Sequence, residues 1–278
     1  MDHRIALSGV IMMVLLWISG PLEANSECLE CHDSGEAMLG FVHDTHNTQC
    51  VDCHGQSAEH VDRPRNAPTI VFDKWGDGSL LNETCLGCHD DGGRIHWESG
   101  VHGDANISCT GCHSVHEKRD AVLVDRMQMD VCVDCHKGLV AQLNYPSHHP
   151  VEEGASQCSN CHATHGSANE ASLTRASVTE TCVSCHKEKR GPFLFEHDPV
   201  TEDCGLCHKP HGSILPSLLT SRPPFLCQQC HQAAGHPSRL PDGTALNVND
   251  TNLKGMGCVN CHSQVHGSNH PSGARLTR

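Results

Sequence analysis

The sequence is poor in the residues that usually build a protein core. Only nine of its 278 residues are aromatic, namely five Phe, three Trp and one Tyr. Hydrophobic residues, with Cys counted among them, make up 37% of the chain, against about 45–50% in an ordinary soluble domain. Aromatic side chains normally supply much of the buried apolar area. We therefore expect something other than side chains to fill the interior.

Basic residues are also scarce, which limits the possible partners. The chain has 19 Lys and Arg against 33 Asp and Glu, a formal charge of −14 with His neutral. Binding to nucleic acid needs clustered Lys and Arg that neutralise phosphates. The composition excludes nucleic acid as the expected partner and favours docking with basic protein surfaces.

Long hydrophobic runs are missing after the N-terminus. Residues 1–24 have the pattern of an export signal peptide, with Arg4 before an apolar stretch from Ile5 to Ile18 and a small-residue cleavage site at 22–24. An uncleaved membrane anchor is the alternative, but this apolar stretch of 14 residues falls short of the roughly 20 that span a bilayer. We expect an exported, periplasmic mature chain of residues 25–278.

Cysteine is abundant, and its spacing is uniform. All twenty cysteines belong to Cys-x-x-Cys-His motifs. The cysteine pairs are Cys28/Cys31, Cys50/Cys53, Cys85/Cys88, Cys109/Cys112, Cys132/Cys135, Cys158/Cys161, Cys182/Cys185, Cys204/Cys207, Cys227/Cys230 and Cys258/Cys261. The histidines that complete them are His32, His54, His89, His113, His136, His162, His186, His208, His231 and His262.

This spacing is that of covalent c-type haem attachment. In a helical turn, positions i and i+3 share a face, so two thiols reach the two vinyl groups along one porphyrin edge. The following histidine then projects toward the iron as its proximal ligand. Disulfides, zinc sites and thioredoxin-like redox pairs are the alternatives for an exported, Cys-rich chain. None of them requires His after every second Cys.

Short helices are expected at the motifs. Ser177 and Glu180 form a capping-box pattern directly before Cys182. Asn82 is expected to cap the turn that enters Cys85.

Fifteen further histidines supply candidates for the opposite, distal face of each iron. In four motif pairs, a histidine lies shortly upstream of the second motif: His43, His102, His149 and His197. In the last pair, His236 follows the first motif instead. A second set lies just downstream of the even-numbered motifs: His60, His116, His165, His211 and His266. His46 and His148 remain open alternatives to His43 and His149. His96 and His270 are likewise open alternatives to neighbouring candidates, with a surface position as the other interpretation and the expected one for His270. His3 lies in the signal.

The distal histidines are expected to connect different motifs. His116, His165 and His211 come three residues after a proximal His, so on a helix they share its face and cannot reach the other side of the same porphyrin. Each must bind another haem, and folding should depend on haem insertion. Methionine, the usual alternative ligand, is too scarce in the mature chain to serve ten sites. Bis-histidine ligation closes both faces of the iron, which favours electron transfer over catalysis.

The ten motifs form five two-haem modules at approximately residues 25–80, 81–128, 129–177, 178–223 and 224–278. Residues 55–84 and 232–257 contain Pro, Gly and Asp and are expected to be loops. We predict a multihaem cytochrome c fold, mostly irregular coil with short α-helices around ten covalently bound haems, elongated, with little or no β-structure.

The sequence resembles the MtrA/PioA/MtoA/DmsE-type decahaem cytochromes over nearly all of residues 25–278. The matching stretches are CVDCHGQSAEH from Cys50, HWESGVHGDANISCTGCHSVH from His96, ETCVSCHKEKRGPFLFEHDPVTEDCGLCHKPHGS from Glu180, RPPFLCQQCH from Arg222 and GCVNCHSQVHGSNHPS from Gly257. The resemblance implies a cytochrome inside an outer-membrane β-barrel porin. It would conduct electrons between periplasmic redox proteins and an extracellular cytochrome, metal or terminal reductase.

Two other functions stay open at this point. A soluble periplasmic electron shuttle or storage cytochrome needs the same motifs without a barrel. A multihaem enzyme needs an iron with an open coordination position, and all ten motifs are intact, so we expect an electron-transfer protein with no catalytic residues.

Overall fold

The computed structural model describes residues 27–32, 43, 48–117, 119–231, 257–271 and 273–277. The chain divides into two compact units, Met1–Val71 and Phe72–Arg278. The proposed signal peptide and most of the predicted loop at 232–257 lie outside the described residues. The five-module division stays a prediction.

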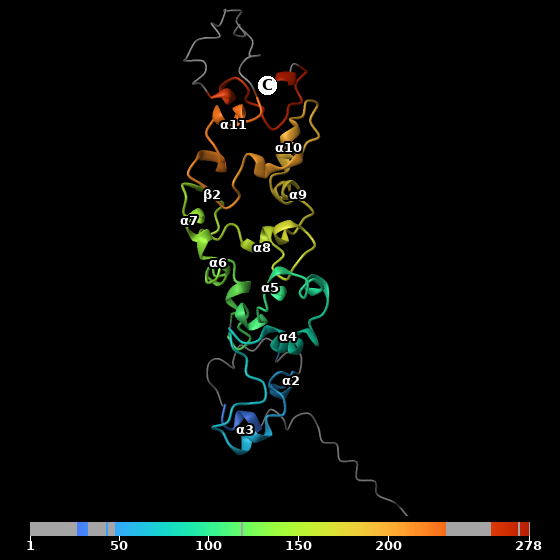
Figure 1. Ribbon diagram of the computed structural model, residues 1–278, viewed down its shortest axis with the longest axis vertical. Coiled ribbons are helices and arrows are strands. Elements are labelled where there is room, and N and C mark those ends of the chain that lie inside the picture. Colours follow the sequence, from blue (N-terminus) through green and yellow to red (C-terminus); the bar gives the residue numbers. More distant parts are fainter. Residues whose placement is uncertain are drawn as a thin grey trace, which may run out of the picture. The chain divides into compact units, whose positions relative to one another are not determined.

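Short helices joined by irregular segments make up both units (Figure 1). In the first unit these are α2 Cys50–His54 and α3 Ala58–Asp62. In the second they are α4 Gly78–Leu86, α5 Val101–Asp104, α6 Gln128–Val133, α7 Val140–Leu143, α8 Cys158–Cys161, α9 Val178–Val183, α10 Asp198–Glu202 and α11 Phe225–Gln228. Single 3-10 turns are η2 Gly92–Arg94, η3 Cys109–Gly111, η4 Ala121–Leu123, η5 Lys137–Leu139, η6 Glu170–Ser172, η7 Lys187–Lys189, η8 Cys204–Leu206, η9 Pro216–Leu218, η11 Cys258–Asn260 and η12 Gly273–Arg275.

Strand structure is minimal in the described residues. The strands β1 Ser147–His148 and β2 Gly212–Ser213 form one antiparallel pair, with Ser147 opposite Ser213. Isolated bridges join His162 to Leu173, Phe195 to Ser268 and His208 to Leu219. The prediction of short helices with little β-structure is confirmed.

The helix starts agree with the sequence at one position and differ at another. Ser177 caps α9, and its side chain accepts the Glu180 N–H at 3.1 Å, as predicted. The prediction for Asn82 was wrong, because α4 begins earlier, at Gly78, and Asp77 caps it by accepting the Ser79 N–H. Asn82 instead lies buried inside α4.

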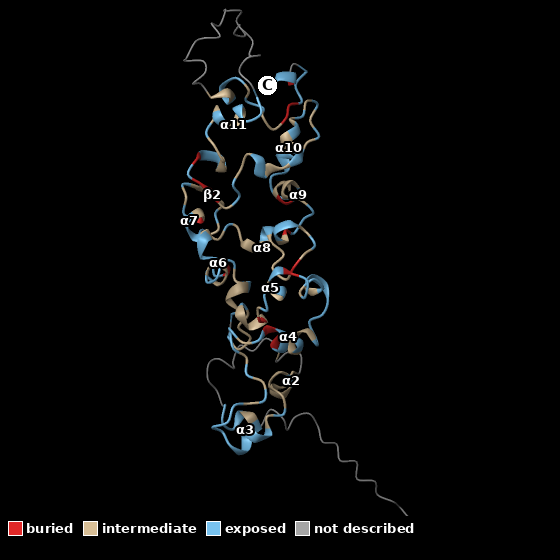
Figure 2. Ribbon diagram, viewed as in Figure 1, coloured by how far each residue is buried: buried red, intermediate tan, exposed pale blue. Residues whose placement is uncertain are grey.

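The described chain buries few apolar side chains (Figure 2). Its buried hydrophobic residues are Leu81, Leu143, Leu173 and Leu215. Large apolar side chains such as Trp75, Ile95, Ile214 and Phe225 are more than 60% exposed. The described part of the polypeptide therefore has no core of the usual size, as the composition predicts.

The segments that follow two of the even-numbered motifs have the same structure. The chain turns back on itself, so that Ala163 N–H donates to Ser172 O and Lys209 N–H donates to Leu218 O. Each turn contains two consecutive residues with positive φ, Ala171 and Ser172 in the first and Ser217 and Leu218 in the second. This recurrence places equivalent side chains of the two segments in equivalent positions.

No helix among the described residues combines the length and the hydrophobicity that a bilayer crossing requires.

Candidate haem-attachment sites

All ten Cys-x-x-Cys-His motifs form a single helical turn. In nine of them the His N–H donates to the carbonyl of the first Cys at 2.8–3.0 Å, and the tenth is helix α2. The turn places both thiols and the imidazole of a motif toward one side, as attachment to a porphyrin edge requires. None of the twenty cysteines, all of which lie in the described residues, forms a disulfide.

The first cysteines of the two motifs in a module contact each other. A hydrogen bond between Cys85 and Cys109 raises the pKa of the Cys85 thiol and lowers that of Cys109. The equivalent bond from Cys132 lowers the pKa of Cys158 to about 7. The same contact joins Cys28 to Cys50, Cys182 to Cys204 and Cys227 to Cys258.

The second cysteines lie near those of the next module. Burial raises the pKa of Cys112, and the nearby Cys135 raises it further. Burial and then a neighbouring second cysteine likewise raise the pKa of Cys161, beside Cys185, and of Cys207, beside Cys230. Consecutive motifs of the second unit therefore approach each other through alternating first and second cysteines.

Four second cysteines stand outside these neighbour pairs: Cys31, Cys53, Cys88 and Cys261. Cys31 and Cys261 belong to the first and last motifs of the chain, whereas Cys53 and Cys88 belong to different units. Cys31, Cys88 and Cys261 are exposed, and Cys53 is half-buried within α2. Their motif turns are like those of the other second cysteines. Their role in haem attachment therefore stays a prediction from the motif.

Imidazole rings face each other in pairs, and each pair joins a proximal and a distal candidate. His, Cys, Asp and Glu side chains of the described residues do not gather in groups of three or more that could hold a metal ion. Seven ring pairs have centroids 5.9–6.2 Å apart: His32/His60, His136/His102, His113/His165, His186/His149, His162/His211, His231/His197 and His208/His266.

This ring separation fits an iron between the two imidazoles. Metal–nitrogen bonds of about 2 Å on each side place the two ligating nitrogens about 4 Å apart. The remainder of the 6 Å is the distance from each nitrogen to its ring centroid. Direct ring stacking would be closer, so each pair leaves room for one metal ion and the porphyrin that carries it.

Six of the seven pairs connect consecutive modules. The histidine upstream of a second motif faces the first proximal histidine of the next module, as His102 faces His136. The histidine downstream of a second motif faces a proximal histidine of the preceding module, as His165 faces His113. The exception is His32/His60, which lies within the first unit.

Backbone contacts between modules produce these pairs. Ser147 pairs with Ser213 and Phe195 with Ser268, so that His149 and His197 each lie close to the turn that carries the downstream histidine. The approach is close, since a Cβ on Gly212 would lie 1.9 Å from the Gln142 carbonyl oxygen. Glycine follows the downstream histidine in three modules, at Gly166, Gly212 and Gly267.

Carbonyl groups fix the orientation of the distal rings. The Nδ1 atoms of His102, His149 and His197 bind the carbonyls of Thr164, Pro210 and Val265 respectively. Each of these carbonyls belongs to the residue just before a downstream histidine. Occupied Nδ1 atoms leave Nε2 as the nitrogen available to a metal ion, and such partners hold a ring in place.

The proximal rings of the even-numbered motifs are anchored in the same way, with one exception. Nδ1 binds a backbone carbonyl in four motifs: His54 to Ile70, His162 to Ala171, His208 to Ser217 and His262 to Arg275. In the fifth, His113 Nδ1 binds the Asp120 carboxylate at 2.6 Å.

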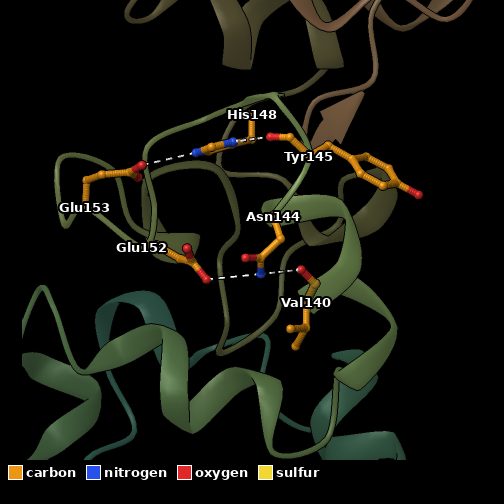
Figure 3. Close-up of polar contacts among 6 residues, drawn as sticks. All are labelled: Val140, Asn144, Tyr145, His148, Glu152 and Glu153. Atoms are coloured by element: carbon orange, nitrogen blue, oxygen red, sulfur yellow. Dashed lines mark hydrogen bonds and ion pairs between the residues drawn. The ribbon is translucent and has the colours of Figure 1, made fainter. Parts of the chain in front are cut away.

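His148 and its neighbour His149 have different surroundings, and Figure 3 shows the contacts of His148. His148 Nδ1 contacts the Tyr145 carbonyl, and its Nε2 lies 3.2 Å from Glu153 Oε1. The carbonyl and then the carboxylate raise the pKa of His148. With both ring nitrogens engaged by the protein, His148 is poorly placed to bind iron, whereas His149 faces His186.

Other candidates stand outside these seven pairs. His43 and His116 belong to the described residues, whereas His46 and His236 lie outside them. The proximal histidines His54, His89 and His262 are not members of the seven pairs. The His96 carbonyl oxygen lies close to Gly100 and Gly166. The backbone N–H of His270 donates to the Ser268 hydroxyl.

In three modules, a polar side chain joins the two motifs through hydrogen bonds that were not predicted from the sequence. Asn82 donates to Ile107 O and accepts the Cys109 N–H at 2.8 Å. Gln128 accepts the Ser159 N–H, and Thr179 accepts the Cys204 N–H. Each lies three or four residues before the first cysteine of its module. This shared position is the sequence feature from which their role could have been predicted.

Comparisons with known proteins agree with this site. Residues 148–191 and 197–236 match the doubled CXXCH motif family, and residues 50–135 match the family of NrfB-like c-type cytochrome proteins. The chain is 42% identical to the multiheme cytochrome MtrA of Shewanella baltica over 90% of this chain and 80% of that protein. It is 26% identical to the cytochrome c-type protein NrfB of Haemophilus influenzae over 41% of this chain and 65% of NrfB.

The motifs and the coil-rich fold define a multihaem c-type cytochrome, an electron-transfer protein rather than an enzyme. Within that class the chain belongs to the MtrA-type cytochromes, which confirms the resemblance seen in the sequence.

Proposed function

We propose that the chain holds ten haems c, each ligated by two histidines, and passes electrons along them in sequence order. The cysteines of each motif would attach one porphyrin, and the motif histidine would bind its iron. The ring pairs supply the second ligand in seven sites. His43, His116 and His236 remain as candidates for the other three. When bound, haem supplies reversible one-electron iron chemistry.

The observation that carries this proposal is the unbroken series of cysteine neighbours in the second unit. It runs through Cys85/Cys109, Cys112/Cys135, Cys132/Cys158, Cys161/Cys185, Cys182/Cys204, Cys207/Cys230 and Cys227/Cys258. Because each cysteine marks a porphyrin edge, consecutive attachment sites adjoin from the third motif to the tenth. Two imidazoles on each iron leave no position for a substrate.

We further propose that the protein is exported to the periplasm and conducts electrons across the outer membrane inside a porin-type β-barrel. Its electron donors and acceptors would be periplasmic redox proteins on one side and an extracellular cytochrome, metal or terminal reductase on the other. The relationship to MtrA supports this placement. The acidic composition suits docking with basic surfaces of redox partners.

Two measurements test the proposal. The intact mass of the mature protein should equal residues 25–278 plus ten haems, and a smaller number of additions contradicts the attachment sites. Purification in mild detergent should recover a β-barrel protein with the cytochrome. Recovery from the periplasmic fraction alone, without a barrel, would instead support a soluble shuttle or storage cytochrome.

A further inference from the structure

We propose that Asp120 lowers the reduction potential of the haem attached at Cys109 and Cys112, by acting on the proximal ligand His113. Asp120 is a positioning residue, because it contacts the ligand and not the iron. The inference rests on the proposed haem ligation at this motif.

The Asp120 carboxylate is held in place on the His113 ring. Its Oδ2 atom lies 2.6 Å from His113 Nδ1, and its Oδ1 atom accepts the Ser114 N–H at 3.3 Å. The Asp120 side chain is only 9% exposed and that of His113 is 29% exposed. Limited exposure weakens solvent screening of the carboxylate charge.

At His113, a carboxylate takes the place of the backbone carbonyl that binds the proximal histidine in other even-numbered motifs. His162 and His208 bind carbonyls inside the left-handed turns at 171–172 and 217–218. After His113 the chain instead forms η4, and Asp120 occupies the residue directly before it. A neutral carbonyl dipole has thus been exchanged for a full negative charge at one ring.

Other carboxylates near histidines do not reproduce this contact. Glu188 Oε1 lies 3.8 Å from the proximal His186 Nδ1, beyond hydrogen-bond distance, and both side chains are more than half exposed. Glu153 contacts His148, which is outside the seven ring pairs. The 2.6 Å contact of Asp120 with His113 is shorter than both of these.

A carboxylate partner changes what the imidazole gives to the iron. Charge-assisted hydrogen bonds are shorter and about twice as strong as neutral ones. A carboxylate that accepts the Nδ1 proton raises the basicity of the ligating nitrogen. The more basic ligand and the negative charge both stabilise ferric over ferrous iron, so reduction becomes less favourable. Hydrogen bonding to an axial ligand is a recognised means of setting a haem potential.

The test is Asp120→Asn in the full-length protein loaded with haem. Asn preserves the size of the side chain and an oxygen that can accept the Nδ1–H, but it removes the charge. Potentiometric titration, followed optically and by electron paramagnetic resonance, should show one of ten components at a higher potential. We expect its equilibrium constant for reduction to rise at least tenfold, which is about 59 mV for one electron.

Matched variants separate the charge from a structural effect. Asp120→Glu retains the charge and should restore the potential toward that of the wild type. Glu188→Gln removes an exposed carboxylate near another proximal histidine and should leave all ten components in place. Asp120→Ser, smaller and also neutral, provides the same reading should the Asn variant lose haem.

The proposal is overturned if ten haems are attached and the neutral variants leave every potential unchanged, or lower one. An equal shift in Glu188→Gln overturns it as well. A wild-type protein without a haem at Cys109 and Cys112, shown by peptide mass mapping, contradicts the proposed function itself and is thereby distinguished.

Discussion

His113 and His165 belong to different motif pairs, yet their rings face each other with centroids 6.0 Å apart and planes 14° from parallel. In the proposed ligation, one module supplies a ligand for the haem of another, which couples the two modules in folding because neither site is complete alone. The same exchange recurs at five further ring pairs in the second unit.

Replacing His165 should therefore affect the haem of the Cys109 motif and not that of the adjacent Cys158 motif. In His165→Ala, one haem in ten should become high-spin and bind carbon monoxide. Optical titration with carbon monoxide measures this fraction. His270→Ala is the control, with no reactive haem expected, and a fully low-spin His165 variant would contradict the pairing.

The adjacent histidines at 148 and 149 provide a sharper comparison. His149→Ala should open one iron, because its ring faces His186 at 6.2 Å. His148→Ala should leave all irons low-spin, since both of its ring nitrogens contact protein atoms. Electron paramagnetic resonance of the two variants distinguishes them, and a high-spin signal in His148→Ala alone would reverse the assignment.

The ring angles predict two classes of low-spin signal. Planes are 63° apart in His102/His136 and 53° apart in His149/His186, whereas the other five pairs lie within 27° of parallel. Crossed imidazole planes leave two iron d orbitals nearly equal in energy, which increases the anisotropy of the g-values. We expect both highly anisotropic and ordinary rhombic signals in the frozen ferric protein. A single class would contradict these angles.

Asn82→Ala should lower the free energy of unfolding. The residue is 5% exposed, and its side chain binds Ile107 O and Cys109 N–H. Leaving buried polar groups without partners costs about 1–3 kcal/mol for each group. Thermal denaturation of the haem-loaded variant should show a lower midpoint.

Asn144→Ala is the matched control for this substitution. Asn144 is an exposed residue that hydrogen-bonds Val140 O and Glu152 (Figure 3). Its replacement should change stability by less than about 0.5 kcal/mol. Equal losses in the two variants would show that burial of Asn82 does not matter.

Removal of haem should prevent folding. The described residues bury only four large apolar side chains, too few to offset the conformational entropy of ordering the chain. Protein made without the haem-attachment machinery should lack stable structure in circular dichroism and be digested rapidly by protease. A protease-resistant apoprotein would contradict the view that haem forms the interior.

The motifs, the small core and the distal candidates could be predicted from the sequence because they depend on local spacing and composition. All fourteen histidines of the seven ring pairs were named as proximal or distal candidates. Which ring faces which could not be predicted, since it depends on backbone pairing between modules, as at Phe195 and Ser268. Asn82 was misassigned for a related reason, because its partners at Ile107 and Cys109 are distant in sequence.

The central claim is that ten irons each carry two imidazoles. Near-infrared magnetic circular dichroism of the mature ferric protein tests it directly, because its charge-transfer bands report the identity of the axial ligands. The account predicts bis-histidine bands whose intensity corresponds to ten haems per polypeptide. Intensity for fewer haems, or bands of histidine–methionine or high-spin iron, would contradict it.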